Sequence, residues 1–349
     1  MDTVRVLITG AGAPGIRGTL YSLKTNWDNR KIITIGVDMK ADVVGKYLCD
    51  KFYQIPPASS EEFIPTLLDI CEKEEVDVIL PQVTAELYPL SKHKRDFEKI
   101  GTKVAVSGYE AIELANSKKE LMKIAKKVGV PAPEFYAVRT WDELESSAEK
   151  LGFPFVVKPP VASGMRGFRI VYKNINRKEV FFKEKPDSSK VTMEELHNIL
   201  GDEFPELLAM EYLPGREYSV DILSSADNVH VVVPRRRDII RTGITFAGTV
   251  EKREDIIEFS ERLTLEIGLE YATGLQFKED ENGIPKVIES NPRIQGTMVL
   301  STVAGANVIY GAVKLALGEE LPEFRVRWGA KLLRFWGGVG VVDGGVFEI

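Results

Sequence analysis

The side chains with the clearest chemical potential follow a short apolar run within residues 286–293. Because side chains alternate faces along a strand, Glu289 and Asn291 are predicted to point to the same side. A carboxylate beside an amide carbonyl offers the hard oxygen ligands that Mg²⁺ prefers. Pro292 would end the strand, and Arg293 is a planar cation suited to phosphate or carboxylate. The segment predicts a magnesium site beside the terminal phosphates of a nucleotide, and the alternative is an ordinary polar strand edge.

A second candidate is a lysine that precedes a loop of small residues. Lys158 ends the strand-like run 153–157 and is followed by the loop 159–167. Such a loop can present backbone N–H groups to an anion, while Ser163 adds a hydroxyl and Arg166 a charge. The order differs from a Walker loop, in which the lysine follows the glycines. The pattern predicts phosphate binding, and the alternative is a hairpin loop with a surface lysine.

A third candidate is the segment 210–221, in which Glu211 and Glu217 flank a Pro214-Gly215 turn. Such a turn could hold an adenine through backbone hydrogen bonds, with a carboxylate accepting from ribose hydroxyls. Taken alone, the pattern is more often typical of a plain connection.

The N-terminus carries a glycine fingerprint, Gly10-x-Gly12-x-x-Gly15, with Asp38 at the end of the next strand. This spacing fits a dinucleotide site, because glycines let backbone N–H groups approach an anion at a helix N-terminus. Arg17 in the turn and the lack of a catalytic His or Tyr–Lys arrangement argue against NAD. Three interpretations stay open: an NAD site, a tight turn that packs helix on sheet, and an anion site for a second substrate.

Composition limits the class of protein. The 349 residues are 44% hydrophobic and carry a formal net charge of -6, which argues against a nucleic-acid partner. No apolar run is long enough to cross a bilayer, so no membrane partner is expected. Cys49 and Cys71 form no disulfide framework, and the three histidines have no zinc-ligand spacing. We therefore expect a cytoplasmic protein.

The first part of the chain alternates between strand and helix patterns. Strands are predicted at 4–9, 31–38 and 76–81, and helices at 16–24 and 61–75. This alternation is typical of parallel βαβ units. Residues 1–115 are therefore expected to form a doubly wound α/β domain.

Residues 116–349 are expected to mix helices and strands in an α+β arrangement. A helix at 116–128 ends in the linker 129–133, and the polar stretch 173–190 is expected to carry a loop at 186–189. Further strands are expected at 153–157, 167–172, 207–212, 218–224 and 229–234, and further helices at 193–200, 255–267 and 308–317. Residues 273–278 and 286–290 are predicted to form a hairpin, and the glycines of a strand-like tail after residue 324 to form turns.

Taken in order, these motifs resemble the ATP-grasp superfamily. They are Lys118 ahead of Gly129-Val130-Pro131, Lys158 with its loop, Glu211 and Glu217, Gln276, and Glu289-x-Asn291-Pro-Arg293. The resemblance covers about residues 1–320 and is greatest to one half of the carbamoyl-phosphate synthase large subunit and its stand-alone relatives. It implies a Rossmann-like pre-ATP-grasp domain over 1–115. A two-lobed ATP-grasp fold would follow over 116–349, with a lid lobe at about 130–209.

By this resemblance, one group of residues binds ATP. The lysines would contact the phosphates, the loop 162–167 would cover them, and the residues around the Pro-Gly turn would surround the adenine and hold the ribose. This group is Lys118, Lys158, Ser163, Gly164, Arg166, Gly167, Glu211, Tyr212, Leu213 and Glu217.

A second group binds metal and the reacting groups. The implied ligands of one or two Mg²⁺ (or Mn²⁺) ions are Gln276, Glu289 and Asn291. Arg293 would stabilise an acyl phosphate or its transition state, and Lys158 would act with it. Arg235-Arg236-Arg237 and Arg241 could bind the acceptor anion, with Arg237 and Arg241 as the catalytic candidates. The alternative for these arginines is a solvated basic edge.

Two positions depart from relatives of this family. Gln276 replaces the carboxylate that many of them carry. The carbamoyl-phosphate synthase group tolerates this replacement. Arg293-Ile294-Gln295 is similar to biotin carboxylases, but Thr297 stands where their catalytic Glu follows. The resemblance therefore does not extend to a residue that deprotonates bicarbonate.

The implied reaction has two steps: ATP phosphorylates a carboxylate, and an amine or ammonia then displaces phosphate. Phosphoryl transfer needs positioning and charge neutralisation rather than a protein nucleophile. The carboxylate would be bicarbonate or an amino acid. Ammonia would be free or come from a separate amidotransferase subunit, and the chain could form a homodimer. The alternatives are an NAD-dependent oxidoreductase and a non-catalytic ATP-binding subunit.

Overall fold

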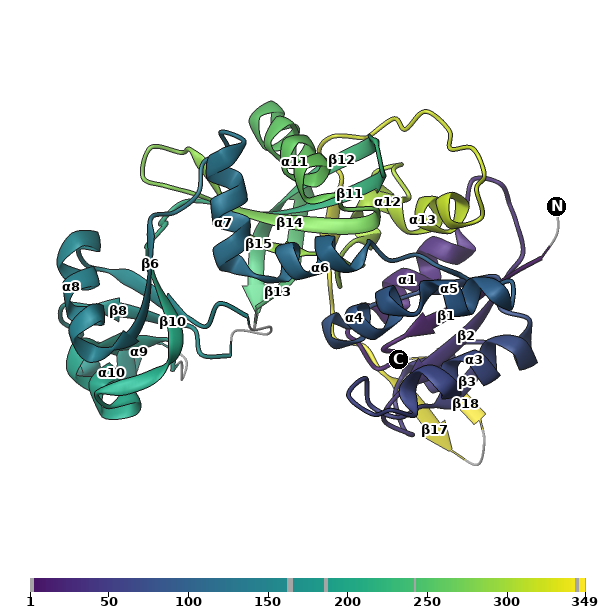
Figure 1. Ribbon diagram of the computed structural model, residues 1–349, viewed down its shortest axis with the longest axis horizontal. Coiled ribbons are helices and arrows are strands. Elements are labelled where there is room, and N and C mark those ends of the chain that lie inside the picture. The colour runs from purple at the N-terminus through teal and green to yellow at the C-terminus, as the bar shows by residue number, and fades with distance from the viewer. Residues whose placement is uncertain (1–2, 162–165, 185–187, 242, 343–344, 349) are drawn as a thin grey trace. The chain divides into compact units, whose positions relative to one another are not determined.

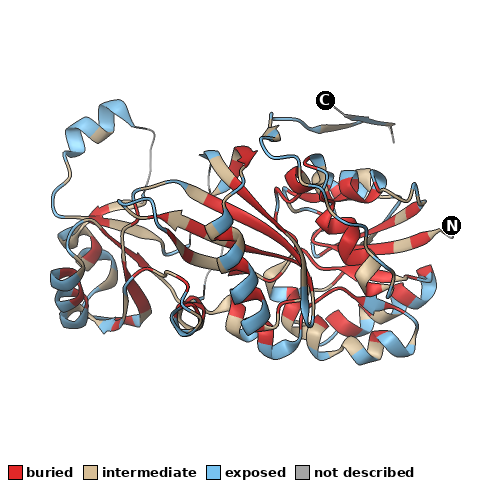
Figure 2. Ribbon diagram, turned by 90° about the horizontal axis from the view of Figure 1, so that it is seen from above, coloured by how far each residue is buried: buried red, intermediate tan, exposed pale blue. Residues whose placement is uncertain are grey.

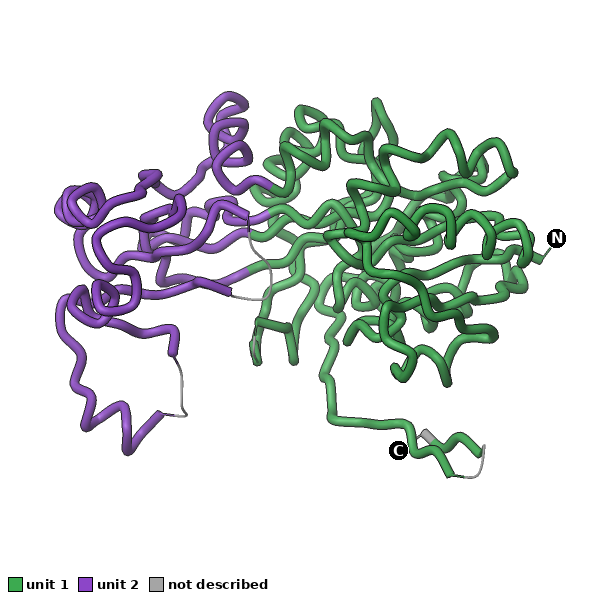
Figure 3. Tube along the Cα trace, turned by 60° about the horizontal axis from the view of Figure 1, so that its bottom comes forward, with its two compact units in different colours: residues 1–116, 218–276, 290–349 green, residues 117–217, 277–289 purple. Residues whose placement is uncertain are grey.

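The structure is a computed structural model that describes residues 3–161, 166–184, 188–241, 243–342 and 345–348 (Figure 1). The chain divides into two compact units (Figure 3). Unit 1 comprises residues 1–116, 218–276 and 290–349, and unit 2 comprises residues 117–217 and 277–289. The predicted boundary between residues 115 and 116 lies within one residue of the first boundary of this division. The other limits of the predicted domains, 1–115 and 116–349, stay a prediction.

Unit 1 begins with a five-stranded parallel sheet in the order β3-β2-β1-β4-β5. Its strands are β1 Val4–Thr9, β2 Ile32–Asp38, β3 Lys51–Gln54, β4 Val78–Leu80 and β5 Lys103–Val104. Its helices are α1 Ile16–Lys24, α2 Gly45–Leu48, α3 Phe63–Glu74, α4 Thr84–Lys92, α5 Lys94–Lys99 and α6 Tyr109–Asn116. The predicted doubly wound α/β fold is confirmed. The strand order reverses direction between β1 and β4, where such folds form their ligand crevice.

Alternating side chains of β1 explain why both faces of this sheet are covered. Val6 and Ile8 are fully buried in a cluster with residues of α1 and of α13 Val308–Ala316. Leu7 faces the other way, into a cluster with Phe63 and Leu67 of α3. Strands β1 and β2 are accordingly buried along most of their length, whereas the edge strand β3 is not (Figure 2). Because α13 completes one of these cores, the C-terminal part of unit 1 is needed to close the N-terminal fold.

The second sheet has six strands in the order β15-β14-β11-β12-β13-β16. The strands are β11 Glu217–Ser225, β12 Asn228–Arg241, β13 Ile244–Val250, β14 Tyr271–Glu279, β15 Pro285–Asn291 and β16 Lys331–Leu333, with helices α11 Glu254–Ile267 and α12 Val299–Val303. The predicted hairpin of β14 and β15 is confirmed, and β15 ends immediately before Pro292. The chain passes between the two units within these two strands.

The strand predicted at 229–234 is confirmed, but its end is wrong and the next strand was not predicted. We expected a strand at 229–234, whereas β12 continues to Arg241, and β13 was not predicted. The run of charged residues 235–238 breaks the apolar alternation on which strand prediction depends. Register shifts between β12 and β13 at Arg237 and Ile239 add a further irregularity. Antiparallel pairing with β13 nevertheless satisfies the backbone of these residues.

Unit 2 contains a five-stranded sheet in the order β6-β10-β7-β8-β9. The strands are β6 Phe135–Thr140, β7 Phe155–Lys158, β8 Arg169–Tyr172, β9 Lys190–Thr192 and β10 Glu203–Glu211, with helices α7 Lys118–Lys127, α8 Trp141–Leu151, α9 Arg177–Lys183 and α10 Met193–Leu200. Val157 and Ala209 face the core shared with α8 and α10. Val156 and Met210 face the opposite side, toward Met122 of α7.

Local capping explains where several helices of unit 2 begin. Ser117 caps α7 by accepting from the Glu120 N–H, so the predicted helix at 116–128 starts later and follows the separate helix α6. The polar stretch 173–190 also contains α9, which Asn176 caps and which was not predicted. Part of its predicted loop at 186–189 lies outside the described residues. Short polar segments of this kind carry no apolar periodicity, so only the cap residue signals the helix.

The tail after residue 324 is strand-like, as predicted. It forms β16 and a separate hairpin of β17 Val339–Val342 and β18 Gly345–Glu348. Gly340 lies within β17 instead of in a turn, and Gly344 lies outside the described residues. Among the helices that the structure describes, none combines the length and the apolar character needed to cross a membrane.

Candidate active site

Two lysines and a glutamate from three separate segments meet in unit 2. Lys118 begins α7 and is 7% exposed, and its Nζ lies 3.5 Å from Glu289 Oε1 on β15. Lys158 ends β7, and its Nζ donates to the Ile288 carbonyl at 3.4 Å. The Lys118 N–H donates to the Pro160 carbonyl at 3.1 Å, which ties the start of α7 to the chain after Lys158. The predicted phosphate-binding lysines and one predicted metal ligand are therefore brought together.

The electrostatics of this cluster favour an anion. Burial lowers the pKa of Lys158 to about 8, and the charge of Lys118 acts in the same direction, while Glu289 and Glu217 oppose it. A lowered lysine pKa means that the charged form lacks sufficient compensation from its surroundings. An anionic group close to Lys158 would supply that compensation. Perturbed lysines of this kind are typical of functional sites.

The predicted adenine-binding residues lie at the end of β10. Glu211 Oε1 accepts from Lys286 Nζ at 2.6 Å, and Oε2 accepts from the Glu134 N–H at 3.1 Å. Leu213 is 4% exposed and Tyr212 is half-buried. Because the Glu211 carboxylate is bound on both oxygens, backbone groups of 211–213 are the better candidates for contacting a base.

An apolar surface lies beside these residues. Tyr212, Phe168 and Ile170 pack against the cluster that contains Val156 and Met210. An aromatic and aliphatic surface of this kind suits the flat face of a nucleobase. The surface and Lys158 lie on neighbouring strands, because Leu208 and Met210 of β10 pair with Lys158 and Val156 of β7.

The Pro214-Gly215 turn is fixed against β14. The Gly215 N–H donates to the Glu279 carbonyl at 2.9 Å, and a Cβ at Gly215 would lie only 2.6 Å from Glu279 Cβ. Glycine is therefore required for this close approach. Glu217, predicted to hold a ribose, is half-buried with Oε2 3.6 Å from Lys278 Nζ.

The predicted metal ligands belong to different units. Glu289 lies in unit 2, whereas Gln276 and Asn291 lie in unit 1. Gln276 is half-buried between fully buried Leu275 and Phe277, as its predicted orientation requires. One carboxylate and two amide oxygens are a donor set that fits Mg²⁺ when nucleotide oxygens complete the shell. In the described part of the chain, His, Cys, Asp and Glu form no group of three able to hold a metal ion. The metal set stays a prediction.

Arg293 is held at the start of the segment that follows β15. Its Nε donates to Thr84 Oγ1 at 3.0 Å, Nη1 to the Ile294 carbonyl at 3.0 Å, and Nη2 to Asn291 Oδ1 at 3.3 Å. Thr84 is the first residue of α4, after β4. The guanidinium is therefore oriented by the edge of the N-terminal sheet at which ligands bind in such folds.

The predicted acceptor-binding arginines divide into different environments. Arg237 donates to Thr245 Oγ1 at 2.8 Å and to the Gly243 carbonyl at 2.6 Å. The Arg241 guanidinium lies 4.0 Å from the centroid of the Phe246 ring. Arg236 pairs with Asp238 and Glu251.

Arg235 requires a correction. It is 1% exposed and ion-paired with Asp221 at 2.6 Å in the interior of unit 1. It therefore cannot bind a substrate anion, and it is not a solvated edge residue either. The sequence run of three arginines obscured the alternation of faces along β12.

The backbone of the glycine fingerprint already contacts other groups of the protein. The Gly12 N–H donates to Asp38 Oδ2 at 2.8 Å, although a dinucleotide site would need that carboxylate for a ribose. A Cβ at Gly15 would lie 2.7 Å from Gly296 Cα. These contacts favour the interpretation of a tight turn that lets two backbones pack closely.

Sequence reasoning missed Glu86, in the first turn of α4. Glu86 is 7% exposed, and its Oε2 has no hydrogen-bond partner among the described residues. Burial raises the pKa of Glu86 to about 7, and the charge of Asp38 acts in the same direction. The available signal was its position, since it follows the predicted strand 76–81 by five residues and must lie near the carboxyl edge of the sheet.

The phosphate-loop prediction can be followed only in part. Ser163 and Gly164 lie outside the described residues, and Arg166 and Gly167 are exposed. Gly167 has a φ of +72°, and a Cβ there would lie 2.7 Å from the Pro159 ring.

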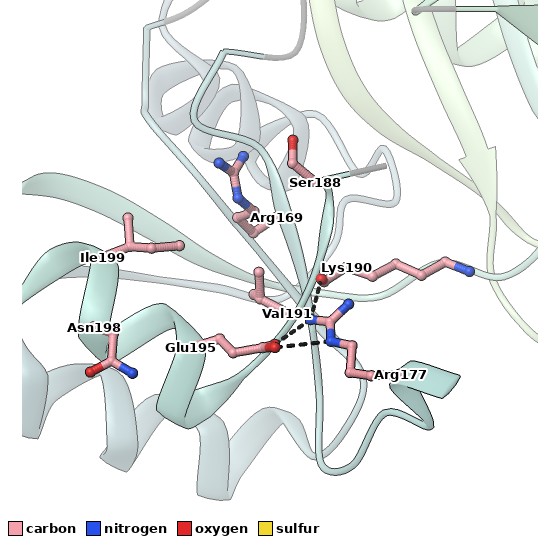
Figure 4. Close-up of a pocket in the computed structure, with 8 residues that line it drawn as sticks. All are labelled: Arg169, Arg177, Ser188, Lys190, Val191, Glu195, Asn198 and Ile199. Atoms are coloured by element: carbon pink, nitrogen blue, oxygen red, sulfur yellow. Dashed lines mark hydrogen bonds and ion pairs between the residues drawn. The ribbon is translucent and has the colours of Figure 1, made fainter. Parts of the chain in front are cut away.

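A shallow pocket of about 390 Å³ lies elsewhere in unit 2, between β8, β9, α9 and α10 (Figure 4). Arg177 crosses it to pair with Glu195 and donates to the Lys190 carbonyl. None of the predicted site residues lines this pocket.

Comparisons with known proteins agree with this architecture. A family described as "PylC-like, N-terminal domain" matches residues 6–105, and a family described as "ATP-grasp in the biosynthetic pathway with Ter operon" matches residues 203–332. The carbamoyl phosphate synthase large chain of Clostridium perfringens (strain 13 / Type A) is 25% identical over 342 residues, which are 92% of this chain and 30% of that one. The chain thus spans less than a third of the length of such relatives.

Two solved structures show the same fold. The biotin carboxylase domain of Hydrogenobacter thermophilus 2-oxoglutarate carboxylase, a dimer in complex with MgADP, ADP and bicarbonate, has a TM-score of 0.68 at 20% identity, covering 94% of this chain and 73% of that one. The ADP complex of N5-carboxyaminoimidazole synthetase from Staphylococcus aureus has a TM-score of 0.66 at 18% identity, covering 93% and 80%. Residues 6–105 are therefore similar to PylC-like N-terminal domains and residues 203–332 to an ATP-grasp domain, and the chain shares its fold with biotin carboxylase and N5-carboxyaminoimidazole synthetase.

Proposed function

We propose that the chain is an ATP- and Mg²⁺-dependent ligase that joins a carboxylate to an amine or to ammonia through an acyl phosphate. The observation that carries this proposal is the cluster of Lys118, Lys158 and Glu289. Lys158, whose charge is incompletely compensated, and the neighbouring Lys118 suit the polyphosphate of a nucleotide. Glu289, which pairs with Lys118, suits a divalent cation on the same phosphates.

In this proposal the residues of unit 2 bind the nucleotide. The apolar surface around Tyr212 receives the adenine, backbone groups of 211–213 recognise its edge, and Glu217 accepts from the ribose hydroxyls. Lys118 and Lys158 donate to phosphate oxygens and neutralise their charge. The loop 162–167 covers the phosphates and excludes water, as an acyl phosphate requires.

The metal site is proposed from Glu289, Asn291 and Gln276. A bound Mg²⁺ would neutralise charge on the phosphates and serve as a template for the transfer. Mn²⁺ is an alternative with similar ligand preference. Gln276 contributes a neutral oxygen where many relatives have a carboxylate, so this site carries one negative charge fewer.

The first step transfers the γ-phosphoryl group. A carboxylate oxygen of the substrate attacks the γ-phosphorus, the bond to the β–γ bridging oxygen breaks, and ADP leaves. Arg293 is placed by Thr84 and donates to the acyl phosphate as charge develops on it. Such a step depends on positioning and charge stabilisation more than on covalent catalysis by the protein.

The second step releases phosphate. The nitrogen of the amine or ammonia attacks the acyl carbon, a proton is lost from that nitrogen, and the carbon–oxygen bond to phosphate breaks. Arg237 and Arg241 are the proposed contacts of the acceptor. Glu86, in the first turn of α4 two residues after Thr84, is a second proposed contact for the amine.

Bicarbonate and amino acids are the proposed carboxylates. The bicarbonate complex of a similar fold supports the first, and the relation to carbamoyl phosphate synthases agrees with it. A homodimer and a separate ammonia-supplying subunit belong to the same proposal.

The test is ADP release from Mg-ATP with bicarbonate or a panel of amino and hydroxy acids, with and without ammonium. We expect ADP only with one carboxylate, and more of it when the nitrogen donor is present. Tight ATP binding without ADP release on any acid would favour a non-catalytic subunit. NAD(H) binding that is lost in Gly12→Ala would favour the oxidoreductase instead.

A further inference from the structure

A buried ion pair lies beneath the segment that carries Arg293. Asp221 on β11 is fully buried and Arg235 on β12 is 1% exposed. The Arg235 Nη2 donates to Asp221 Oδ1 at 2.6 Å, while its Nη1 donates to Thr297 Oγ1 at 2.8 Å. The second oxygen of Asp221 accepts from Ser301 Oγ. Both ends of the pair therefore bind the segment 297–301.

Stability alone is a poor explanation for this pair. Removing two charges from water costs free energy that their mutual attraction repays only when every polar atom is satisfied. The Arg235 Nε has no hydrogen-bond partner among the described residues. Well-packed apolar residues of similar volume often serve stability as well or better. The pair is therefore better explained by the geometry that it imposes on Thr297 and Ser301.

Two further contacts fix the same segment from other sides. The Gln295 Nε2 donates to the Val220 carbonyl at 3.1 Å, in space left by Gly274, where a Cβ would lie 1.4 Å from that nitrogen. Gly296 packs against the backbone of Gly15. The segment 293–298 is thus held at 295, 296 and 297, with Arg293 at its start.

We propose that Asp221 and Arg235 are positioning residues that hold the segment 293–298, through Thr297 and Ser301, so that Arg293 meets the reacting groups in one orientation. The catalytic part of this inference rests on the proposed function of Arg293. The anchoring part does not, since it concerns the protein without substrate. Arg235 acts at a distance and contacts neither nucleotide nor acceptor.

The matched variants are Thr297→Val and Thr297→Ser. Valine has nearly the same shape as threonine but lacks the hydroxyl that accepts from Arg235, whereas serine keeps it. Amide hydrogen exchange without substrate tests the anchoring directly. We expect residues 293–301 to exchange faster in Thr297→Val and at the wild-type rate in Thr297→Ser, with exchange in β1 and β2 unchanged. Equal exchange in both variants would overturn the anchoring.

Steady-state kinetics with the carboxylate that supports ADP release test the catalytic part. We expect kcat of Thr297→Val to fall about ten- to a hundredfold, as for a small displacement of a reacting group. The KM for ATP should change less than twofold, because the predicted nucleotide contacts are elsewhere. A kcat equal to that of Thr297→Ser would overturn the catalytic role. If the wild type releases no ADP with any acid, the proposed function fails and hydrogen exchange still decides the anchoring.

A second pair of variants separates positioning from stability. Asp221→Leu alone leaves a buried, uncompensated Arg235 and should lower the melting temperature. The double variant Asp221→Leu/Arg235→Met removes both charges and should therefore melt at a higher temperature than the single variant. If the pair positions Arg293, the double variant keeps a low kcat despite this recovery. Recovery of kcat together with the melting temperature would reduce the pair to a structural role.

Discussion

Lys158 and Arg235 are both basic residues on strands, but they differ in what balances their charge. Arg235 donates to a carboxylate and a hydroxyl within hydrogen-bond distance. Lys158 donates to one carbonyl at 3.4 Å and lies near a second lysine, which with burial lowers its pKa to about 8. Arg235 is therefore a structural cation. The positive charge of Lys158 is incompletely compensated, as expected of a residue that binds an anionic ligand.

Removing the charge of Lys158 or of Glu289 should lower turnover by orders of magnitude while the fold is kept. Lys158→Ala and Glu289→Ala should each lower kcat for ADP release by about 10²–10³, as when a donor to a developing charge is lost. Circular dichroism and melting should stay close to wild type, since both side chains are half-buried. Lys123→Ala, an exposed change on α7, is the control. Wild-type turnover in Glu289→Ala would contradict the metal assignment.

The lowered pKa of Lys158 predicts how nucleotide binding depends on pH. The charged form binds phosphate and is lost above a pH of about 8 in the free protein, so kcat/KM for ATP should fall as pH rises through that value. Lys158→Arg, which stays charged, should remove this fall even if its activity is lower. If kcat/KM of Lys158→Arg falls above a pH of about 8 as in the wild type, the titration belongs to another group.

Glu86 predicts that the stability of the fold depends on pH, because its pKa is raised instead of lowered. Burial raises its pKa to about 7 in the folded protein, so the folded state holds a proton that the unfolded state releases at its ordinary, lower pKa. The free energy of unfolding should therefore fall as pH rises between about 4.5 and 7, by about 3 kcal/mol in all.

Glu86→Gln cannot ionise and should flatten this slope, whereas Glu110→Gln on the exposed face of α6 should leave it unchanged. Denaturant unfolding at pH 5 and pH 8 measures the difference. Parallel pH profiles for wild type and Glu86→Gln would mean that Glu86 keeps an ordinary pKa.

At the scale of elements, the helices α7, α8, α9 and α10 of unit 2 each begin after a residue whose side chain caps them. Thr140 and Thr192 each form a capping box with the glutamate three residues later, Glu143 and Glu195. Glu195 also pairs with Arg177 of α9. One residue thus connects the start of α10 to the neighbouring short helix.

Loss of the α10 cap should destabilise unit 2 by a predictable amount. Thr192→Ala removes the oxygen that accepts from the Glu195 N–H and should cost about 1 kcal/mol of unfolding free energy, while Thr192→Ser should cost much less. Denaturant unfolding of the two variants provides the comparison. Equal losses in both would place the effect in packing of the threonine methyl instead of the cap.

At the scale of the whole molecule, the two units have separate hydrophobic cores. The clusters around Val157 and Val156 contain only residues of unit 2, and those around Ile8 and Leu7 only residues of unit 1. The predicted nucleotide-binding residues all belong to unit 2, while the proposed acceptor contacts belong to unit 1. The proposal thus assigns the two substrates to different units of the chain.

This division predicts a selective effect of nucleotide on unfolding. A non-hydrolysable ATP analogue with Mg²⁺ at a hundred times its Kd should stabilise the part that binds it by about 2.7 kcal/mol. Hydrogen exchange should show the larger protection in the core strands of unit 2. Lys158→Ala should show no such shift at the same analogue concentration. Protection confined to β1, β2 and α1 would instead favour a nucleotide at the glycine fingerprint.

The sequence by itself determined the elements with strong periodicity. The N-terminal βαβ pattern, the hairpin of β14 and β15 and the end of β15 before Pro292 all follow from local rules, because apolar spacing and proline act over a few residues. The order of motifs also indicated the ATP-grasp superfamily before any contact was known. Several elements, among them α4, α8, α9 and β13, were not predicted. In α9 and in the second half of β12, charged residues mask the apolar pattern, and only capping or pairing decides.

Only the tertiary structure decided which charged residues are available to bind a ligand. Arg235, Arg236 and Arg237 are indistinguishable in sequence, yet one is buried against Asp221, one pairs on the surface and one holds a turn. Asp38 looks like a ribose ligand until Gly12 is seen to donate to it, and Glu86 looks like an ordinary helix residue until its burial is known. The reason is physical: the pairing and desolvation of a charge depend on groups from distant segments, and spacing along the chain does not specify them.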